Sequence, residues 1–193
     1  MCRRHHGVLY TALSQVNSYA RRGCFDCKPP QGRFPKVASS REYPERPIVG
    51  VGGVIIDNGR ALLIRRGGEP LRGEWSIPGG TLELGESLQQ GVERELREET
   101  GLEVRVLELI EVFDRIFPND DLQWPERKDQ PRFHFVIVDY LCERIGGEPR
   151  AGSDVTHVAF ASEDELGQFH LTETATRVLK KAFAMDLARR SAG

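Results

Sequence analysis

Apolar and polar positions divide the chain into an amino-terminal arm and a regularly patterned domain. Residues 1–46 are rich in Arg, Gly, Pro and Ser and keep no helical or strand period, which predicts a loosely structured arm. The next segment, 48–57, reads IVGVGGVIID, an apolar and β-branched run that is typical of a buried strand. The Asn58-Gly59 pair predicts a hairpin turn, with 60–66 as the returning strand.

Further along, the pattern predicts more strands and two helices. One helix is expected between residues 87 and 101, and a second, amphipathic helix over 172–187 carries Ala, Val, Leu and Phe on one side. The strands are expected over 104–117, 132–143 and 155–161. This order of elements favours an α/β domain with a mixed sheet over 47–184, followed by a frayed tail over 185–193.

Composition and charge are those of an ordinary globular protein. The chain has 193 residues, 39% hydrophobic and 29% charged, which suits one domain with an appendage. A net charge of −2 gives no electrostatic case for binding nucleic acid or a membrane surface. No apolar run reaches the roughly 18 to 20 residues of a membrane-spanning helix, and no convincing secretory signal is present. Four cysteines in a chain of this length do not suggest a disulfide framework, so we expect a cytoplasmic protein.

The arm contains one pattern that could bind a metal. Cys24 and Cys27 form a CxxC, and Cys2 with His5 forms a CxxH, together the four ligands of a zinc knuckle. A second CxxC is missing and little lies between the two pairs to form a core, so we do not expect zinc there. The Arg-rich, acid-poor beginning also resembles an organelle transit peptide or translated sequence upstream of the true start, and both alternatives stay open.

The segment 80–102, which reads GTLELGESLQQGVERELREETGL, carries the most distinctive chemistry. Positions three and four apart share one face of a helix, so Glu95, Glu98 and Glu99 project together. Their mutual repulsion disfavours a bare helix, and a divalent cation removes that penalty. Hard oxygen ligands of this kind suit Mg²⁺ or Mn²⁺. A turn with two consecutive glycines lets the backbone approach a ligand, so the Gly79 carbonyl is a fourth candidate.

Flanking residues fit a short helix around this acidic face. Ser87 is a candidate for the amino-terminal cap, and Gly101 suits the left-handed residue that ends a helix. Leu96 is expected to face the core. Arg94 lies one turn before Glu98, so the two side chains can pair and hold the carboxylate in one rotamer.

The spacing across this segment resembles a complete Nudix box. Gly80 is followed after five residues by Glu86, and after seven more by the run RELREETGL, which ends at Leu102. Nine fixed positions within 23 residues all match the family's pattern. The resemblance implies a Nudix-type α/β/α sandwich over 47–184, in which the carboxylates of this segment bind magnesium and one of them acts on the attacking water.

The reaction implied by the resemblance is attack of water at the phosphorus of a diphosphate, with divalent ions neutralising the phosphate oxygens. We expect Glu98, Glu95 and Arg94 to be the catalytic residues, with Arg94 orienting Glu98. We expect Glu95, Glu98, Glu99 and the Gly79 carbonyl to hold the metal, with Glu98 and Glu99 as the firmer ligands.

Residues outside the box complete the expected site. Arg65 and Arg66, at the end of the hairpin strand, could reach a phosphate or ribose, although a solvated strand end fits equally well. Family members differ in the residue that serves as base or extra ligand, and here we prefer Asp154, which precedes a predicted strand. The other candidates for that role are Glu126, Asp129 and Asp114.

The substrate is suggested by a looser resemblance. The run from the box through FHFVIVDYLCE to SDVTHVAF resembles ADP-ribose pyrophosphatase-type enzymes of bacteria, which implies cleavage of ADP-ribose or an ADP-sugar to AMP and a sugar phosphate. Hydrolysis of oxidised nucleoside triphosphates, of the 8-oxo-dGTP type, is the alternative among enzymes. A nucleotide-sensing regulator without catalysis is the alternative of another class, and the intact set of glutamates argues against it. Relatives are often dimers, so the resemblance also implies a homodimer.

Overall fold

The computed structural model describes residues 41–119, 129–152 and 154–192. These residues belong to one compact unit, Ser39–Gly193. The four candidate zinc ligands of the arm and Glu126 lie outside the described residues. No helix in the described part of the chain is both long enough and apolar enough to cross a membrane.

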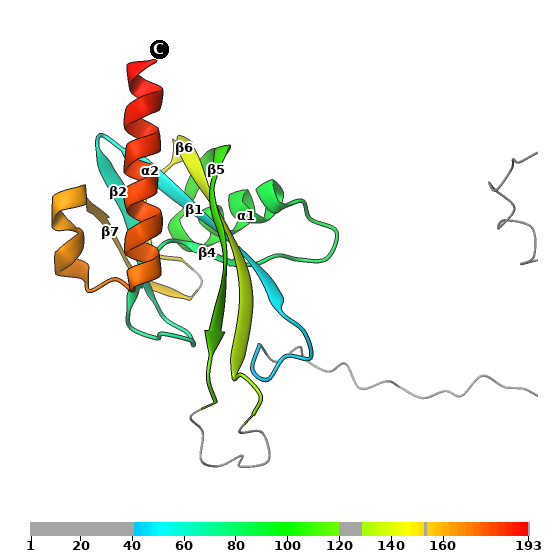
Figure 1. Ribbon diagram of the computed structural model, residues 1–193. Helices are drawn as coiled ribbons and strands as arrows, with labels where there is room; N and C mark the ends of the chain where they lie inside the picture. The colour runs from blue at the N-terminus through cyan, green and yellow to red at the C-terminus, as the bar shows by residue number, and fades with distance from the viewer. Residues whose placement is uncertain (1–40, 120–128, 153, 193) are drawn as a thin grey trace, which may run out of the picture. The chain divides into compact units, whose positions relative to one another are not determined.

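A mixed β-sheet forms the centre of the unit (Figure 1). Strand β1 (Ile48–Asp57) pairs in parallel with β6 (Phe133–Gly147) and antiparallel with β2 (Arg60–Arg66). The path continues in the order β3-β2-β1-β6-β5, with β4 on β1 and β7 on β2. The bounds of the remaining strands are β3 Trp75–Ser76, β4 Gly79–Thr81, β5 Leu102–Phe117 and β7 Val155–Ala161. The predicted mixed sheet is thus confirmed.

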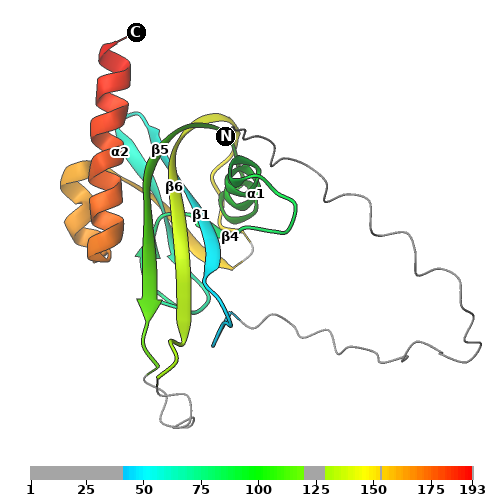
Figure 2. The same cartoon turned by 45° about the vertical axis from the view of Figure 1, so that its right-hand side comes forward.

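Two helices cover opposite faces of this sheet (Figure 2). Helix α1 (Leu88–Thr100) packs Val92 and Leu96 against one side of β1, while α2 (Glu173–Ser191) packs on the other side. Alternate residues of β1 enter the two cores, because successive side chains of a strand point to opposite faces. The expected α/β/α sandwich is therefore confirmed. A short 3-10 helix, η2 (Glu163–Phe169), leads into α2.

The turn between β1 and β2 and the two caps of α1 form at the residues that the sequence predicts. Asn58 and Gly59 both have positive φ, 51° and 74°, as a two-residue hairpin turn requires. Ser87 caps α1, accepting a hydrogen bond from the Gln90 backbone N–H, and the Gln90 side chain returns one to the Ser87 N–H. Gly101 ends the helix in the left-handed conformation. These three predictions are confirmed.

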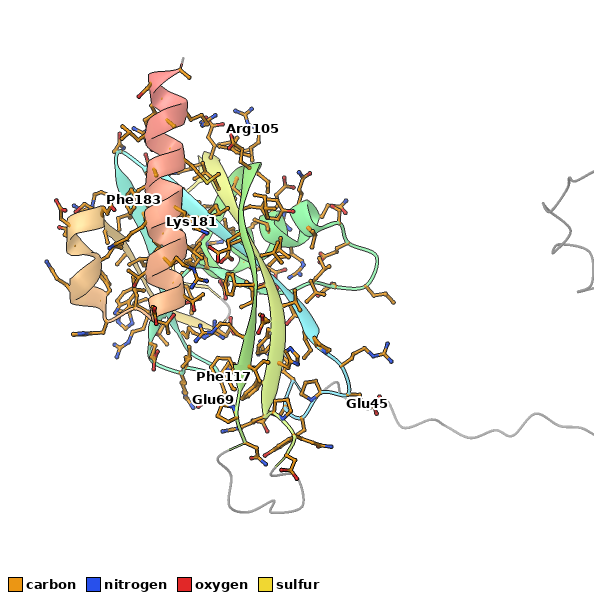
Figure 3. All side chains as sticks on the ribbon, viewed as in Figure 1. Glu45, Glu69, Arg105, Phe117, Lys181 and Phe183 are labelled. Atoms are coloured by element: carbon orange, nitrogen blue, oxygen red, sulfur yellow. The ribbon has the colours of Figure 1, made fainter. Side chains whose placement is uncertain are left out.

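Helix α2 is longer than expected. We predicted its end at residue 187 and a frayed tail over 185–193, but the helix continues to Ser191. Arg190 pairs with Asp186 one turn earlier at 2.7 Å, and basic side chains in the last turn complement the helix dipole. Nearer its other end, α2 is joined to β5 by Glu111, which accepts from Arg177 and from Lys181. Figure 3 labels Lys181 on α2.

The boundary of the arm also needs correction. Residues 41–46 were placed in the arm, yet the Tyr43 N–H donates to the Arg132 carbonyl at 2.8 Å and Arg132 pairs with Glu42 at 2.8 Å. Strands β5 and β6 are likewise longer than expected, because Leu102 pairs with Gly147 at the far end of the ladder. In both places backbone pairing between distant segments sets the boundary, and local patterning does not reveal it.

Candidate active site

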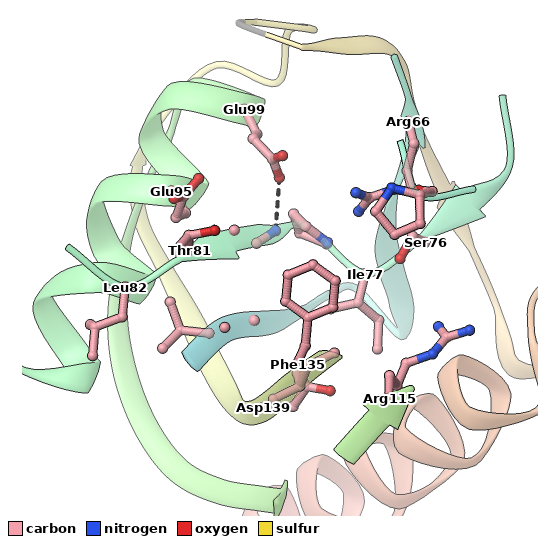
Figure 4. A pocket seen from close by; sticks show the side chains of 18 of the residues that line it. Arg66, Ser76, Ile77, Thr81, Leu82, Glu95, Glu99, Arg115, Phe135 and Asp139 are labelled. Carbon is pink, nitrogen blue, oxygen red and sulfur yellow. Dashed lines mark hydrogen bonds between the residues drawn. The ribbon is translucent and has the colours of Figure 1, made fainter. Parts of the chain in front are cut away.

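A cavity of about 880 Å³ opens beside the acidic face of α1. Glu95, Glu98 and Glu99 line it from the helix, and Asp154 lines it from the turn before β7. Figure 4 shows Glu95 and Glu99 at one end of this cavity and Asp139 with Arg115 at the other. The three predicted glutamates are therefore brought to one cavity, as the helical spacing predicts.

Glu99 is the most buried acid at this end, with only 5% of its surface exposed. Its carboxylate accepts a hydrogen bond from the Gly79 N–H at 2.7 Å (Figure 4). Burial raises the pKa of Glu99 to about 8, and the charges of Asp154 and Glu95 act in the same direction. Burial also raises the pKa of Glu95. A cation in this position would lower the electrostatic cost of holding both groups ionised.

Arg94 joins the acids of the box into one network. Its guanidinium donates to both Glu86 oxygens, at 2.7 and 3.0 Å, and to Glu95 at 2.8 Å. The distance to Glu98 is longer, 3.3 Å. We expected Arg94 to orient Glu98, but its shorter bonds hold Glu95 and Glu86, because a planar fork fits a carboxylate at two points. Hydrogen bonding to Arg94 lowers the pKa of Glu86 to about 2.

Gly80 makes room for one of these acids. A Cβ atom at position 80 would lie 2.5 Å from the Glu95 carboxylate. Strand β4 therefore passes directly beneath Glu95, and the glycine that begins the sequence motif is required by this close approach. The same strand supplies Thr81, whose carbonyl accepts from Arg94 at 3.0 Å.

The acidic end offers the right donors for a hard divalent cation. Carboxylate oxygens are the ligands that Mg²⁺ and Mn²⁺ prefer, and Glu95, Glu98, Glu99 and Asp154 all line the cavity. Within residues 41–119, 129–152 and 154–192, no three acidic, histidine or cysteine side chains converge into a ready-made metal centre. Glu95 is held by Arg94 and Glu99 by the Gly79 N–H, so the donor chemistry fits while the predicted ligand set stays a prediction.

The residues predicted outside the box separate into two groups. Arg66 and Asp154 line the cavity, and their segments are joined because the Gly67 N–H donates to the Asp154 carbonyl at 2.6 Å. Arg65 is not among the lining residues and donates from its Nε to the Gly73 carbonyl at 2.8 Å. Of the two arginines that could reach a phosphate or ribose, Arg66 is therefore the one at the cavity, since neighbouring strand residues point to opposite sides. Substrate contact by either arginine stays a prediction. Asp114 and Asp129 are exposed and do not line the cavity.

Sequence reasoning missed the other end of the cavity. Asp139, Phe135 and Arg115 line it from β6 and β5. Asp139 is only 3% exposed, and burial, with a smaller contribution from Glu111, raises its pKa to about 7. Burial and the charge of Arg66 lower the pKa of Arg115. The one available signal was a single acid within the apolar run FVIVDYL, where a charged side chain is costly to bury.

Comparisons with known proteins agree with this geometry. The family profile described as NUDIX domain matches residues 46–183. The ADP-ribose pyrophosphatase of Methanocaldococcus jannaschii is 36% identical over 62% of this chain and 64% of its own length, so less than two thirds of that relative is matched. A MutT-like protein of Streptomyces ambofaciens is 36% identical over 68% of this chain and 74% of its own. The crystal structure of a MutT NUDIX hydrolase from Burkholderia pseudomallei superposes with a TM-score of 0.58 and 32% identity, covering 71% of this chain and 98% of that one.

Proposed function

The chain belongs to the Nudix family, and from that premise we propose that it hydrolyses the diphosphate bridge of ADP-ribose or an ADP-sugar, with Mg²⁺, to AMP and a sugar phosphate. Mn²⁺ is an alternative ion for the same oxygen donors. A likeness to a relative named ADP-ribose pyrophosphatase supports the choice of substrate.

One observation carries the proposal: four carboxylates and an arginine line the same end of one cavity. Glu95, Glu98, Glu99 and Asp154 provide the negative charge, and Arg66 provides a cation beside them. A divalent ion held by such oxygens neutralises phosphate charge and lowers the pKa of bound water. Arg66 can bind a phosphate oxygen that the ion leaves free. Together these groups suit a substrate with two linked phosphates.

The glutamates of α1 and Arg94 have different roles in the proposed reaction. Glu98 is the most exposed of the three glutamates, with half of its side chain accessible, and its contact with Arg94 is the longest in the network. It is therefore the carboxylate that can turn most easily toward an attacking water and accept its proton. Glu95 and Glu99 are held in place by Arg94 and by the Gly79 N–H, which suits fixed ligands. Arg94 is a positioning residue.

The decisive experiment is a substrate panel with magnesium. The protein is incubated with ADP-ribose, ADP-glucose, NADH and 8-oxo-dGTP, and the products are identified by chromatography. We expect AMP from ADP-ribose at the highest kcat/KM. Glu98→Gln should lower kcat by about 10²–10⁴-fold, the range for a positioned proton acceptor, while the thermal unfolding midpoint stays unchanged. Glu93→Gln, an exposed glutamate of the same helix outside the cavity, is the matched control.

Other outcomes of this panel would overturn the assignment. Preferred turnover of 8-oxo-dGTP would make the protein a nucleoside triphosphate pyrophosphohydrolase. Binding of ADP-ribose without product would make it a sensor. Equal losses in Glu98→Gln and Glu93→Gln would remove Glu98 from catalysis.

A further inference from the structure

Asp139 is a buried acid that the proposed hydrolysis does not use. It comes from the middle of β6, lines the cavity, and is 3% exposed. In the described part of the chain, no side chain or backbone N–H donates a hydrogen bond to its carboxyl group. Figure 4 places it at the end of the cavity opposite Glu95 and Glu99. Burying an acid without a donor is costly, so a ligand that supplies one would be bound favourably.

Asp139 lies against a glycine and near aromatic side chains that line the cavity. A Cβ atom at Gly52 would lie 2.1 Å from Asp139 Oδ1, so the absence of a side chain on β1 leaves the space that the carboxyl group occupies. Phe135, four residues earlier on the same face of β6, lies beside it at this end of the cavity (Figure 4). Phe113 lines the same wall from β5, where it pairs with Ile137. Aromatic and aliphatic walls around one polar group are typical of a site for a planar, partly polar ligand.

We propose that Asp139 contacts the edge of the substrate's nucleobase and makes this end of the cavity selective for adenine. The proposal rests on the proposed function, since it deepens the assignment of an adenine nucleotide as substrate. A dinucleotide-like substrate would lie along the cavity with its diphosphate among the glutamates and its base against Phe135. Asp139 is in this sense a specificity-determining residue and takes no part in bond cleavage.

The chemistry of the two purine edges explains the selectivity. Adenine presents an amino donor next to a ring-nitrogen acceptor, whereas guanine presents two donors, N1–H and N2–H, side by side. A protonated carboxyl group offers one donor and one acceptor, which complements adenine. An ionised carboxylate offers only acceptors, which complements guanine. Guanine can also offer its O6 acceptor and N1–H donor to a protonated carboxyl group, so ionisation of Asp139 removes the two-point pairing with adenine and leaves one with guanine.

The surroundings of Asp139 bring its ionisation close to neutral pH. Burial and the carboxylate of Glu111, its cross-strand partner on β5, raise the pKa of Asp139 to about 7. Glu111 is itself paired with Arg177 and Lys181 from α2. Arg115 and Arg66 are the cations that line the same cavity from β5 and β2. No charged group comes from β1 at this position, because the residue facing Asp139 is Gly52.

The test measures binding to a protein that does not turn substrate over. ADP-glucose and GDP-glucose differ only in the base, and their diphosphate bridge does not titrate near neutral pH. Their dissociation constants are measured by calorimetry with Glu98→Gln protein at constant magnesium, from pH 6 to 8.5. We expect ADP-glucose to bind about 10-fold more weakly at pH 8.5 than at pH 6, and GDP-glucose to show the opposite trend.

Two further substitutions in this background separate recognition from folding. Asparagine has one donor and one acceptor at every pH, so Asp139→Asn should keep the low-pH affinity for ADP-glucose and remove the opposite pH trends of ADP-glucose and GDP-glucose. Any pH dependence that comes from Glu99 would remain and would be the same for both ligands. Asp139→Leu should weaken ADP-glucose binding by about 10- to 100-fold, because the amino group of adenine would be left unpaired. The thermal unfolding midpoint of each variant checks that it is folded.

The outcomes are distinguishable from failure of the proposed function. One outcome is that the unsubstituted protein releases AMP from ADP-ribose, but both Asp139 variants bind ADP-glucose as tightly as the Glu98→Gln protein at every pH. In that case the role of Asp139 is wrong and the proposed function stands. If GDP-glucose binds more tightly at all pH values, selectivity for adenine is wrong. If neither sugar nucleotide binds or is cleaved, the proposed function fails and this inference fails with it.

Discussion

The two ends of the cavity are built in different ways. The acidic end comes from one continuous segment, residues 80–102, with Asp154 added from the turn before β7. The opposite end is assembled from Gly52, Arg115, Phe135 and Asp139, which belong to three strands far apart in sequence. The first end carries the groups that suit cleavage of a diphosphate, and the second carries groups that suit recognition of what is attached to it. Chemistry and selectivity can therefore change independently in this fold.

At each end, nevertheless, a carboxyl group is packed against a glycine. Glu95 lies over Gly80 as Asp139 lies beside Gly52. The two ends differ in the groups that surround their carboxyl groups. Glu99 and Glu95 have other carboxylates of the same cavity nearby, which favours a cation. The carboxylate that acts on Asp139, that of Glu111, is paired with cations of α2. Among the described residues no donor reaches Asp139, and the aromatic Phe135 lines the same end, which favours a planar hydrogen-bonding ligand. Three sets of measurements test this contrast.

The largest expected effect is on stability as a function of pH without divalent cations. The pKa values of Glu99 and Asp139 rise to about 8 and about 7 in the folded state. The folded protein holds these protons more tightly than the unfolded chain, so the stability they contribute is complete below about pH 4 and is lost as the pH rises through 7 and 8. The free energy of unfolding, measured by urea denaturation in EDTA, should fall from pH 5 to pH 8.5 by an amount on the order of a few kcal/mol, because a tenfold change in an ionisation constant is about 1.4 kcal/mol.

Two substitutions show how much of this loss of stability at high pH comes from each end of the cavity. Glu99→Gln and Asp139→Asn should each flatten part of the curve, and magnesium at pH 8 should restore the part due to Glu99 alone. Glu86, whose pKa is lowered, changes its protonation only below about pH 4.5 and does not contribute in this window. A curve that neither substitution changes would show that burial of these acids has no measurable cost.

The next effect is kinetic and compares the two glycines. Gly80→Ala would put a Cβ atom 2.5 Å from the Glu95 carboxylate, and Gly52→Ala would put one 2.1 Å from Asp139 Oδ1. Displacing a group by about 1 Å can cost up to about 10²-fold in rate. Gly80→Ala should therefore lower kcat for ADP-ribose, whereas Gly52→Ala should mainly raise KM.

The control for this pair is Gly167→Ala, where an added Cβ meets nothing within 4 Å. It should keep both kcat and KM. Thermal unfolding of all three variants shows whether a loss of activity reflects loss of fold. Equal effects of Gly80→Ala and Gly52→Ala on kcat would mean that the two ends do not act separately.

The smallest effect compares neighbouring arginines of β2. Arg66 lines the cavity, whereas Arg65 donates to the Gly73 carbonyl outside it. Arg66→Ala should raise KM for ADP-ribose about 10-fold, the value of one charge-assisted hydrogen bond to phosphate. Arg65→Ala should change KM by less than about twofold. Similar increases for both variants, measured in one steady-state assay, would place Arg65 in the site after all.

Local sequence patterns predict some features of the site and not others. Ser87, Gly101 and the shared face of Glu95, Glu98 and Glu99 follow from the 3.6-residue period of a helix and from the chemistry of its ends. The main partners of Arg94 do not follow from that period. Spacing predicted Glu98, one turn away, but the guanidinium also reaches Glu86 in the preceding loop.

The strands, the two helices, the acidic face of α1 and the family could be read from the sequence alone, because each depends on residues close together along the chain. Tertiary packing sets which acids are buried, which arginine of β2 faces the cavity, and that Asp139 lies across from Gly52. The last of these depends on the pairing of β1 with β6 over a separation of more than 80 residues. The burial of a side chain and its close approach to another segment arise from contacts between residues far apart in sequence. Local sequence patterns therefore do not predict them.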